Sequence, residues 1–220
     1  MTMNHIPAAL MALAGAPMTR RGLAKLRTRE TLLAAAKRLI TERGYEDATV
    51  RDIAKAAGMS TGAVFANFSD KADLFHHVLA EDARVLAETM RQVAALRDEG
   101  VRETLLTVLA AGYAFHLKQL PLLQAAYAES WRRAPSSEAA ARGRMRQIIA
   151  ILEGVLRQAV AIGELRSEID MDLAVDLIWR AYQSNYRLAI YDGFDLDALT
   201  GRLERQLDLI LPSLVLRQAA

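Results

Sequence analysis

The chain of 220 residues has no cysteine, which excludes disulfide bonds and any chemistry that needs a thiol. This absence agrees with a reducing compartment, and we expect the protein in the cytoplasm. No apolar run reaches the roughly 18 residues that cross a bilayer, so we expect no membrane span. With 52% hydrophobic and 25% charged residues, the chain is predicted to form one or two globular domains with a buried core.

Sequence motifs of catalysis are also missing. The chain has no glycine-rich phosphate loop, no Gly-x-Ser-x-Gly elbow and no His-Glu-x-x-His. Asp73, His77 and Glu81 recur every four residues on one helix face, a spacing that can hold a metal ion. A solvated, charge-balanced helix surface is the commoner origin of that pattern. We therefore expect no enzyme, no cofactor and no metal site.

The alternation that is typical of β-strands is absent beyond residue 70, and proline occurs only five times. Helical spacing and capping residues predict an all-α protein of about nine helices. Three of these begin after Thr28, Thr49 and Ser60. The others cover about 71–96, 101–119, 121–133, 137–162, 171–191 and the stretch that follows Asp195.

The stretch from Thr28 to Lys71 carries the start and stop signals of a three-helix unit. Thr28 can cap the first helix, whose apolar residues recur at helical spacing: Leu32, Leu33, Ala36, Leu39 and Ile40. Gly44 ends this helix. Thr49 caps the second helix with Asp52 at its third position, as in a capping box.

Gly58 can adopt the left-handed backbone angle that ends the second helix, and Ser60 caps the third helix two residues later. Helices joined in this way must cross steeply. Val64 and Phe68 are expected to pin the third helix, whose remaining face is small or polar: Thr61, Gly62, Ala63 and Asn67. Because this face is free to enter a major groove, we interpret the third helix as a recognition helix.

The run from Thr49 to Phe75, TVRDIAKAAGMSTGAVFANFSDKADLF, resembles the DNA-binding signature of the TetR family of bacterial transcriptional regulators. The resemblance in motif covers about Thr28 to Leu79, roughly a quarter of the chain. It implies an all-helical homodimer with an N-terminal helix-turn-helix domain and a C-terminal helical domain for ligand binding and dimerisation. It also implies binding to a palindromic double-stranded DNA operator and release by a small-molecule effector.

The resemblance places phosphate contacts at Thr49 and Lys71. The DNA-binding residues that it implies are Thr49, Val50, Arg51, Ser60, Thr61, Gly62, Ala63, Phe65, Asn67 and Lys71. Phe65 and Asn67 stand where the family commonly has Tyr and then His or Tyr, so Phe65 lacks the hydroxyl of a phosphate contact. Because Thr61 and Ala63 offer two methyl groups and one hydroxyl, we expect few base-specific hydrogen bonds and some specificity from DNA shape.

Charge supports a division of the chain. The first 71 residues hold eleven Lys and Arg against six Asp and Glu, a net charge of +5 that suits nucleic acid, while the rest carries −3. Ordinary surface variation would also explain this asymmetry. We divide the chain into a flexible basic arm (1–27), a helix-turn-helix domain (28–72) and a helical ligand-binding and dimerisation domain (73–220).

The apolar stretch from Ile6 to Ala16 is similar to the centre of a signal peptide, but no Lys or Arg precedes it. We expect a disordered arm instead, with the start of the chain at Met1 or at Met18. Its basic residues either lie along DNA phosphates or a minor groove, or form a solvated tail: Arg20, Arg21, Lys25 and Arg27.

The final helix has an apolar seam that consists of Leu199, Leu203, Leu207, Ile210, Leu211 and Leu214. The stripe fits either the face of an intramolecular core or a dimer interface. The resemblance favours the interface, because it implies that the last two helices of each subunit form a four-helix contact. A dimer would hold two recognition helices one DNA turn apart, roughly 34 Å.

The middle helices carry aromatic and hydrogen-bonding residues that are candidates for the implied ligand pocket: Met90, Tyr113, His116, Tyr127, Trp131, Trp179, Gln183 and Tyr186. Such a pocket would suit a hydrophobic or planar compound, unless Arg180, Glu129 or Arg187 joined it. Each residue alone is more typical of a filled core. A regulator without a small-molecule ligand is therefore an alternative, and a fully packed middle region would favour it. A metal-binding or enzymatic helical protein is a third alternative.

Overall fold

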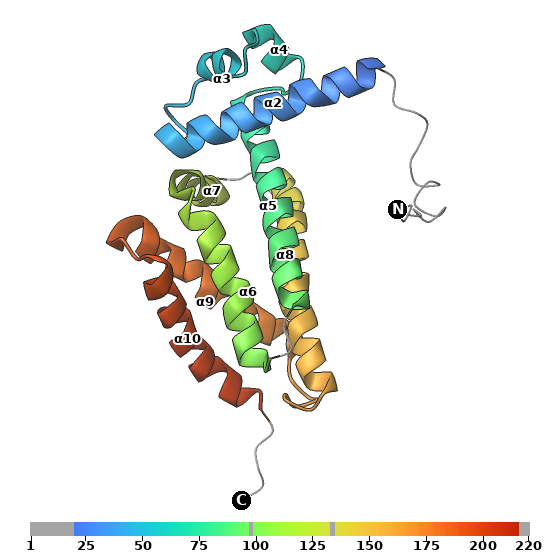
Figure 1. Cartoon of the computed structure of the whole chain (residues 1–220), viewed down its shortest axis with the longest axis vertical. Coiled ribbons are helices and arrows are strands. Elements are labelled where there is room, and N and C mark those ends of the chain that lie inside the picture. The colour runs from blue at the N-terminus through green and yellow to red at the C-terminus, as the bar shows by residue number, and fades with distance from the viewer. Residues whose placement is uncertain (1–19, 97–98, 133–134, 216–220) are drawn as a thin grey trace, which may run out of the picture.

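The computed structural model describes residues 20–96, 99–132 and 135–215 (Figure 1). Over these residues the protein is all-helical, as predicted, with nine α-helices and a closing 3-10 turn. The elements are α2 (Arg20–Arg43), α3 (Val50–Ala56), α4 (Thr61–Phe65), α5 (Lys71–Ala95), α6 (Val101–Leu117), α7 (Leu120–Arg132), α8 (Pro135–Ala161), α9 (Met171–Asp192), α10 (Leu196–Ile210) and the 3-10 turn η1 (Leu211–Ser213).

Side-chain caps start the helices where the sequence predicts them. Thr49 Oγ1 accepts a hydrogen bond from the backbone N–H of Asp52, and Ser60 Oγ accepts one from that of Ala63. Asp70 and Asp195 cap α5 and α10 in the same way. Each such cap stabilises its helix by about 1 kcal/mol, so local chemistry alone accounts for these boundaries.

The start of α2 differs from the prediction. The helix begins at Arg20, so Thr28 lies inside it and caps nothing. The residues between Arg20 and Thr28 are mostly Arg, Leu, Ala and Lys, which favour helix, and no proline interrupts them. The basic arm expected over 1–27 is therefore helical from Arg20 onward. The expectations about Ile6–Ala16 and Met18 lie outside the described residues.

Two hydrophobic cores organise the molecule. The first unites α2, α3, α4 and the start of α5, and it includes Leu74, Phe75 and Val78 of α5. The second lies among α5, α6, α8, α9 and α10. Because α5 contributes to both, it connects the three-helix unit to the helical bundle as one continuous rod (Figure 1). The expected domain boundary at residue 72 falls in the first turn of this helix.

Helix α7 lies directly beneath α2 and forms the second link between the two parts (Figure 1). Its Leu122 is buried in the first core, together with residues of α2 and α5. A movement of α7 would therefore shift the residues of the three-helix unit that pack against it. Among the described helices, none combines the length and the apolar character needed to cross a bilayer.

Candidate nucleic-acid interface and the core beneath it

Helix α4 lies on the outer side of the three-helix unit, held by two buried side chains. Val64 and Phe68 are buried against α2, α3 and α5, as the sequence predicts. Gly58, with φ of 68°, turns the chain between α3 and α4. The opposite face of α4 is exposed, and it presents Thr61, Gly62 and Phe65. The structure thus supplies the short, outward-facing helix that a major groove can accept.

The polar residues that flank α4 have partners within the protein. The side chain of Thr49 caps α3 and also donates to Asp52 Oδ2 at 2.6 Å, and this hydrogen bond holds the pKa of Asp52 below its usual value. Lys71 Nζ donates to the carbonyl of Glu46 at 3.0 Å and lies over the ring of Tyr45, 4.3 Å from its centroid. Both residues remain near the surface, where a phosphate can compete for these groups.

Asn67 turns back toward its own helix. Its Nδ2 donates to the carbonyl of Ala63 at 2.8 Å, and its Oδ1 is buried without a hydrogen-bond partner. Its backbone carbonyl accepts from Arg29 Nη1 at 2.7 Å, while the Arg29 guanidinium covers the ring of Phe68 at 4.2 Å. The side chain of Asn67 therefore supports the end of α4, and its amide group is less free for a phosphate contact than the resemblance implies.

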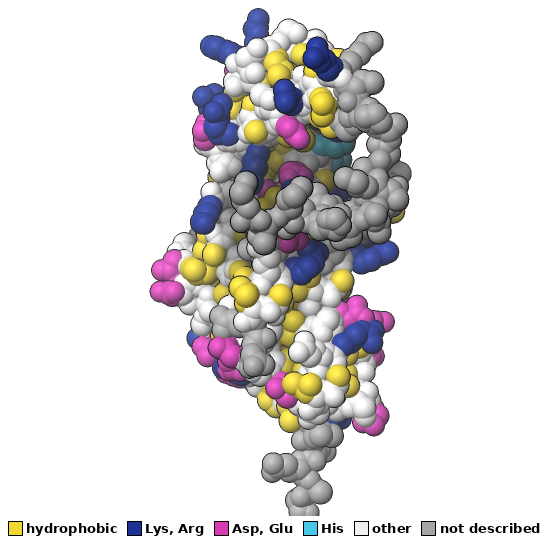
Figure 2. Space-filling view, turned by 45° about the vertical axis from the view of Figure 1, so that its right-hand side comes forward, with side chains coloured by type: hydrophobic (Ala, Val, Ile, Leu, Met, Phe, Trp, Pro, Cys, Tyr) yellow, Lys and Arg dark blue, Asp and Glu magenta, His cyan; other side chains and the backbone are white. Residues whose placement is uncertain are grey.

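Basic side chains gather at the end of the molecule that α2, α3 and α4 form (Figure 2). Arg51 and Lys55 are both exposed on α3, and Arg43 is exposed at the end of α2. Sequence reasoning included Arg51 but missed Lys55, although the two are four residues apart and so share one helix face. Further along α2, Arg20, Lys25 and Arg27 are exposed as well. These cations are positioned for a polyanionic partner.

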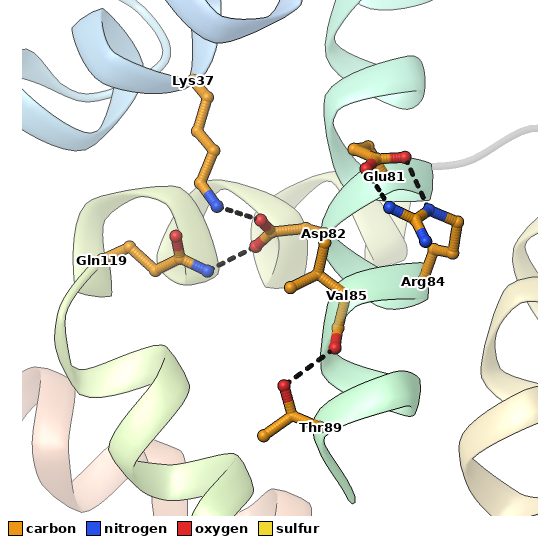
Figure 3. A network of polar contacts seen from close by, with 7 residues as sticks. All are labelled: Lys37, Glu81, Asp82, Arg84, Val85, Thr89 and Gln119. Carbon is orange, nitrogen blue, oxygen red and sulfur yellow. Dashed lines mark hydrogen bonds and ion pairs between the residues drawn. The ribbon is translucent and has the colours of Figure 1, made fainter. Parts of the chain in front are cut away.

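A buried polar network connects the three-helix unit to the bundle (Figure 3). Asp82 of α5 is only 7% exposed, and its two oxygens accept from Lys37 of α2 and from Gln119 at the corner between α6 and α7. Burial raises the pKa of Asp82, while the hydrogen bond and charge of Lys37 act in the opposite direction. In the described part of the chain, Asp82 is the only charged residue that is buried. The carboxylate of Asp82 therefore connects α5 to α2 and to the corner between α6 and α7.

Most of the predicted pocket residues come together in an aromatic cluster between α6, α7 and α9. The Tyr113 ring lies edge-on to that of Tyr186, with centroids 5.2 Å apart, and His116 Nδ1 lies 2.6 Å from Tyr186 Oη. Tyr127 Oη donates to the carbonyl of Gln183 at 3.3 Å. Burial lowers the pKa of His116 to about 4, and the charge of Lys37 acts in the same direction. His116 is therefore neutral at pH 7.

Sequence reasoning missed Tyr182, which lies at the centre of this cluster. Its ring stacks on that of Tyr113 at 4.6 Å, and its hydroxyl contacts that of Tyr186. Its position one helical turn before Tyr186 and three residues after Trp179 was a usable signal. Trp179 packs against it at 5.4 Å. Gly112 makes the close approach possible, since a Cβ there would lie 2.1 Å from Tyr182 Oη.

Two of the pocket candidates lie elsewhere. Trp131 is 88% exposed and is not part of the cluster, because it occupies the last turn of α7, where no described element covers it. Met90 is buried on α5 in the same bundle core. The rings of the cluster pack directly against one another. Two hollows lie elsewhere on the described residues, and neither is lined by any of the eight candidate residues.

The larger of these hollows, of about 450 Å³, lies between the far end of α5, the start of α6 and α8, and its walls include Ala94, Val101, Ile151 and Gly154. The second, of about 430 Å³, opens on the surface of α9 and α10 beside Arg187 and Arg202. Buried Asn185 forms part of its wall and donates to Tyr113 Oη at 3.0 Å. The second hollow is thus connected to the aromatic cluster by one hydrogen bond.

Most of the α10 seam packs within the chain, so the prediction that Leu199, Leu203 and Leu207 contact a second subunit does not fit this structure, while for Ile210 and Leu214 it stays a prediction. Leu199, Leu203 and Leu207 are fully buried, Leu211 is nearly so, and Ile210 and Leu214 are partly buried against the same core. An amphipathic stripe shows that a helix must bury one face, but not against which partner. The outward surface of α9 and α10 has its own large apolar residues: Leu173, Leu177, Tyr191, Leu196 and Leu209.

Comparison with known proteins agrees with this geometry. Residues 32–78 match the family model described as bacterial regulatory proteins, tetR family. A transcriptional repressor of Corynebacterium efficiens, AcnR, is 45% identical over 65 residues, which cover 30% of this chain and 35% of the relative. The repressor BepR of Brucella suis is 27% identical over 189 residues, 84% of this chain and 85% of the relative. The chain thus spans about a third of the length of the AcnR relatives that it matches.

Solved structures share the whole fold at low sequence identity. A TetR-family regulator of Mesorhizobium loti superposes with a TM-score of 0.73 at 19% identity and covers 90% of this chain and 100% of its own. The regulator FadR of Bacillus subtilis, solved in complex with stearoyl-CoA, superposes with a TM-score of 0.71 at 22% identity, over 81% of this chain and 96% of its own. Both helical parts described above therefore occur together in known structures.

Proposed function

Because the chain belongs to the TetR family of bacterial regulatory proteins, we propose that it is a dimeric repressor that binds a palindromic DNA operator and releases it when a small, largely hydrophobic ligand binds. The observation that carries this proposal is helix α4, which is held from behind by Val64 and Phe68 and exposed in front. Exposed cations of α2 and α3 lie at the same end of the molecule, and they suit the phosphates beside a major groove.

The surface of α9 and α10 is the candidate for subunit contact. Leu173, Leu177 and Tyr191 form an exposed stripe along α9, and Leu209 of α10 is 81% exposed. Such large apolar side chains lose contact with water when a second copy packs against them. A two-fold dimer through this surface brings two α4 helices to successive major grooves, about 34 Å apart, as a palindromic operator requires.

The aromatic cluster is the candidate for ligand binding. Neutral His116 and four tyrosines combine apolar area with a few hydrogen-bonding groups, which suits an apolar or planar molecule. The relative FadR, of the same fold, holds stearoyl-CoA, so a long apolar ligand is compatible with this architecture. Since the rings fill the space in this structure, a ligand must displace them, and that displacement supplies the change that releases DNA.

The route of release follows the polar network. His116 lies near the end of α6, three residues before Gln119, and Gln119 holds Asp82 against Lys37 of α2. A ligand that separates the rings shifts the last turn of α6 and weakens the hold of Gln119 on Asp82. The three-helix unit then reorients relative to the bundle, so the two recognition helices no longer match their grooves.

A specific observation favours a second candidate function, a DNA-binding regulator without a small-molecule ligand. The residues of the aromatic cluster are packed against one another, and the two hollows described above lie elsewhere. In this case the helical bundle only forms the dimer contact or binds another protein.

The test begins with a random pool of duplex DNA, from which the purified protein selects ligands at about 150 mM salt. The proposal predicts enrichment of a palindromic sequence, which then binds saturably in fluorescence anisotropy despite scrambled competitor DNA. Failure to enrich any sequence would contradict DNA-binding regulation altogether. Fatty acyl compounds and planar aromatic compounds are next added to the complex. Release by one of them supports the repressor, whereas specific binding that no compound disturbs supports the second candidate.

A further inference from the structure

The outward face of α4 has few hydrogen-bonding groups available to DNA. Residues 60–67 include three polar side chains, those of Ser60, Thr61 and Asn67. The hydroxyl of Ser60 caps α4 by accepting from the backbone N–H of Ala63, and Asn67 Nδ2 donates to the Ala63 carbonyl. Thr61 is exposed and its hydroxyl has no partner among the described residues. Base reading by hydrogen bonds therefore depends on one hydroxyl at most.

The same face is rich in apolar surface. Phe65, the last residue of α4, is 57% exposed, whereas its large neighbours Val64 and Phe68 are buried. Gly62 and Ala66 are exposed beside it and add no bulk. Because both residues are small, they leave the exposed ring of Phe65 accessible to the bases of a groove.

The major groove has one apolar feature that such a ring can recognise. Thymine carries a methyl group at C5, whereas the other three bases present mainly hydrogen-bond donors and acceptors there. Phenylalanine and the methyl group of threonine are suitable partners for that methyl group. The absence of the hydroxyl that a tyrosine would carry at position 65 fits this role, because the ring edge needs no polar partner.

We propose that Phe65 and the methyl group of Thr61 determine operator specificity by packing against the 5-methyl groups of thymines in the major groove. This inference rests on the proposed function, because it concerns the base sequence that the same helix reads. The exposed cations Arg51 and Lys55 of α3 bind phosphates and fix the register, and they leave sequence discrimination to the apolar face of α4.

The experiment replaces thymine by deoxyuridine, one position at a time, in the palindromic duplex selected from the random pool. This exchange removes the C5 methyl group and leaves base pairing intact. Burying one methyl group contributes about 0.8 kcal/mol, which corresponds to a change of about fourfold in Kd. We expect such a loss of affinity at one or more thymines of each half-site, measured by anisotropy with the full-length protein.

Variants assign the effect to particular side chains. Phe65→Ala should bind more weakly and should no longer distinguish thymine from deoxyuridine at the position that its ring contacts. Phe65→Tyr keeps the ring and should keep the discrimination. Thr61→Val retains a methyl group without the hydroxyl, and Thr61→Ser does the opposite, so the first should preserve the thymine preference and the second should reduce it. Thr61 and Phe65 are both exposed, so the four substitutions should leave the core intact. A thermal melt checks that each variant is folded.

Two results would overturn the inference while leaving the proposed function intact. In the first, the selected duplex binds specifically but deoxyuridine at every thymine position leaves Kd unchanged. In the second, Phe65→Ala weakens binding to the thymine and deoxyuridine duplexes equally, which shows that the ring packs on the sugar-phosphate backbone. Failure to select any duplex would instead contradict the proposed function itself.

Discussion

His116 shows how burial changes the chemistry of one residue. Its imidazole lies among tyrosine rings, contacts Tyr186 Oη, and has a pKa lowered to about 4. In the unfolded chain a histidine has a pKa of about 6.5. Between these two values the unfolded state binds a proton that the folded state does not. His116 therefore lowers the stability of the protein as the pH falls below about 6.5.

This linkage predicts that the free energy of unfolding at pH 5 is lower than at pH 7 by about 2 kcal/mol through His116 alone. The measurement is urea unfolding of the native protein and of His116→Gln at both pH values. Because glutamine does not titrate, the difference between the two pH values should shrink by that amount in the variant. An equal pH dependence in both proteins would show that His116 takes up a proton in the folded state.

Lys71 is the residue at which the proposed phosphate contact can be tested most directly. Its ammonium group lies on the carbonyl of Glu46 and the ring of Tyr45, near the exposed start of α5. Lys71→Ala should weaken operator binding and lower the slope of log Kd against log salt by about one, since one fewer counterion is released. Dimerisation should be unaffected. Lys118→Ala, an exposed cation outside the three-helix unit, is the control. Unchanged affinity and salt slope for Lys71→Ala would remove Lys71 from the interface.

At the scale of elements, the contact of α2 with α5 and the α6–α7 corner depends on the buried carboxylate of Asp82 (Figure 3). A buried charge that loses its partner destabilises a protein more than the intact pair stabilises it. The Lys37 side chain is 38% exposed, so solvent screens part of its interaction. The network therefore acts mainly to fix the position of the helices relative to one another.

We predict that Lys37→Met lowers the free energy of unfolding by about 1–3 kcal/mol, because Asp82 is left buried without its cation. The double variant Lys37→Met, Asp82→Leu should recover part of this loss, since no charge remains to be buried. Urea unfolding measures both. Arg84→Met breaks the exposed pair of Arg84 with Glu81 on the same helix, and it should change stability by less than about 0.5 kcal/mol. A double variant no more stable than Lys37→Met would show that the unpaired carboxylate of Asp82 costs little when it is buried.

The boundaries of the helices illustrate what local signals decide. Thr49, Ser60 and Asp195 cap helices where predicted, since a cap requires only the side chain and the next three residues. Thr28 has the same capping chemistry but lies within α2. The residues before it favour helix, and the helix simply continues through. A capping residue therefore allows a helix to begin after it. The helix propensity of the residues before the cap decides whether the helix begins there.

At the scale of the whole molecule, the exposed surface of α9 and α10 is the expected contact between subunits. The double variant Leu177→Arg, Leu209→Arg should shift the protein from dimer to monomer, because a two-fold interface brings each new charge near its own copy. Sedimentation velocity measures the mass, and operator affinity should fall at the same time. Gln92→Arg, at an exposed position of α5, is the control and should leave the mass unchanged. A double variant that remains dimeric would place the interface elsewhere.

The sequence by itself determined the helical class, most of the helix boundaries and the short exposed helix α4, because capping residues, left-handed glycines and helical spacing act over a few neighbouring residues. The tertiary structure decided which helix, or solvent, each helix face contacts. Leu203 and Leu207 have the spacing of an interface but are buried within one chain, while Leu209 beside them is exposed. Trp131 and Tyr127 share a face of α7, yet α9 covers only Tyr127. Tyr182 fills the aromatic cluster because Gly112, 70 residues earlier in the chain, leaves it room. These outcomes depend on which distant helix packs alongside, and periodicity along the chain does not contain that information.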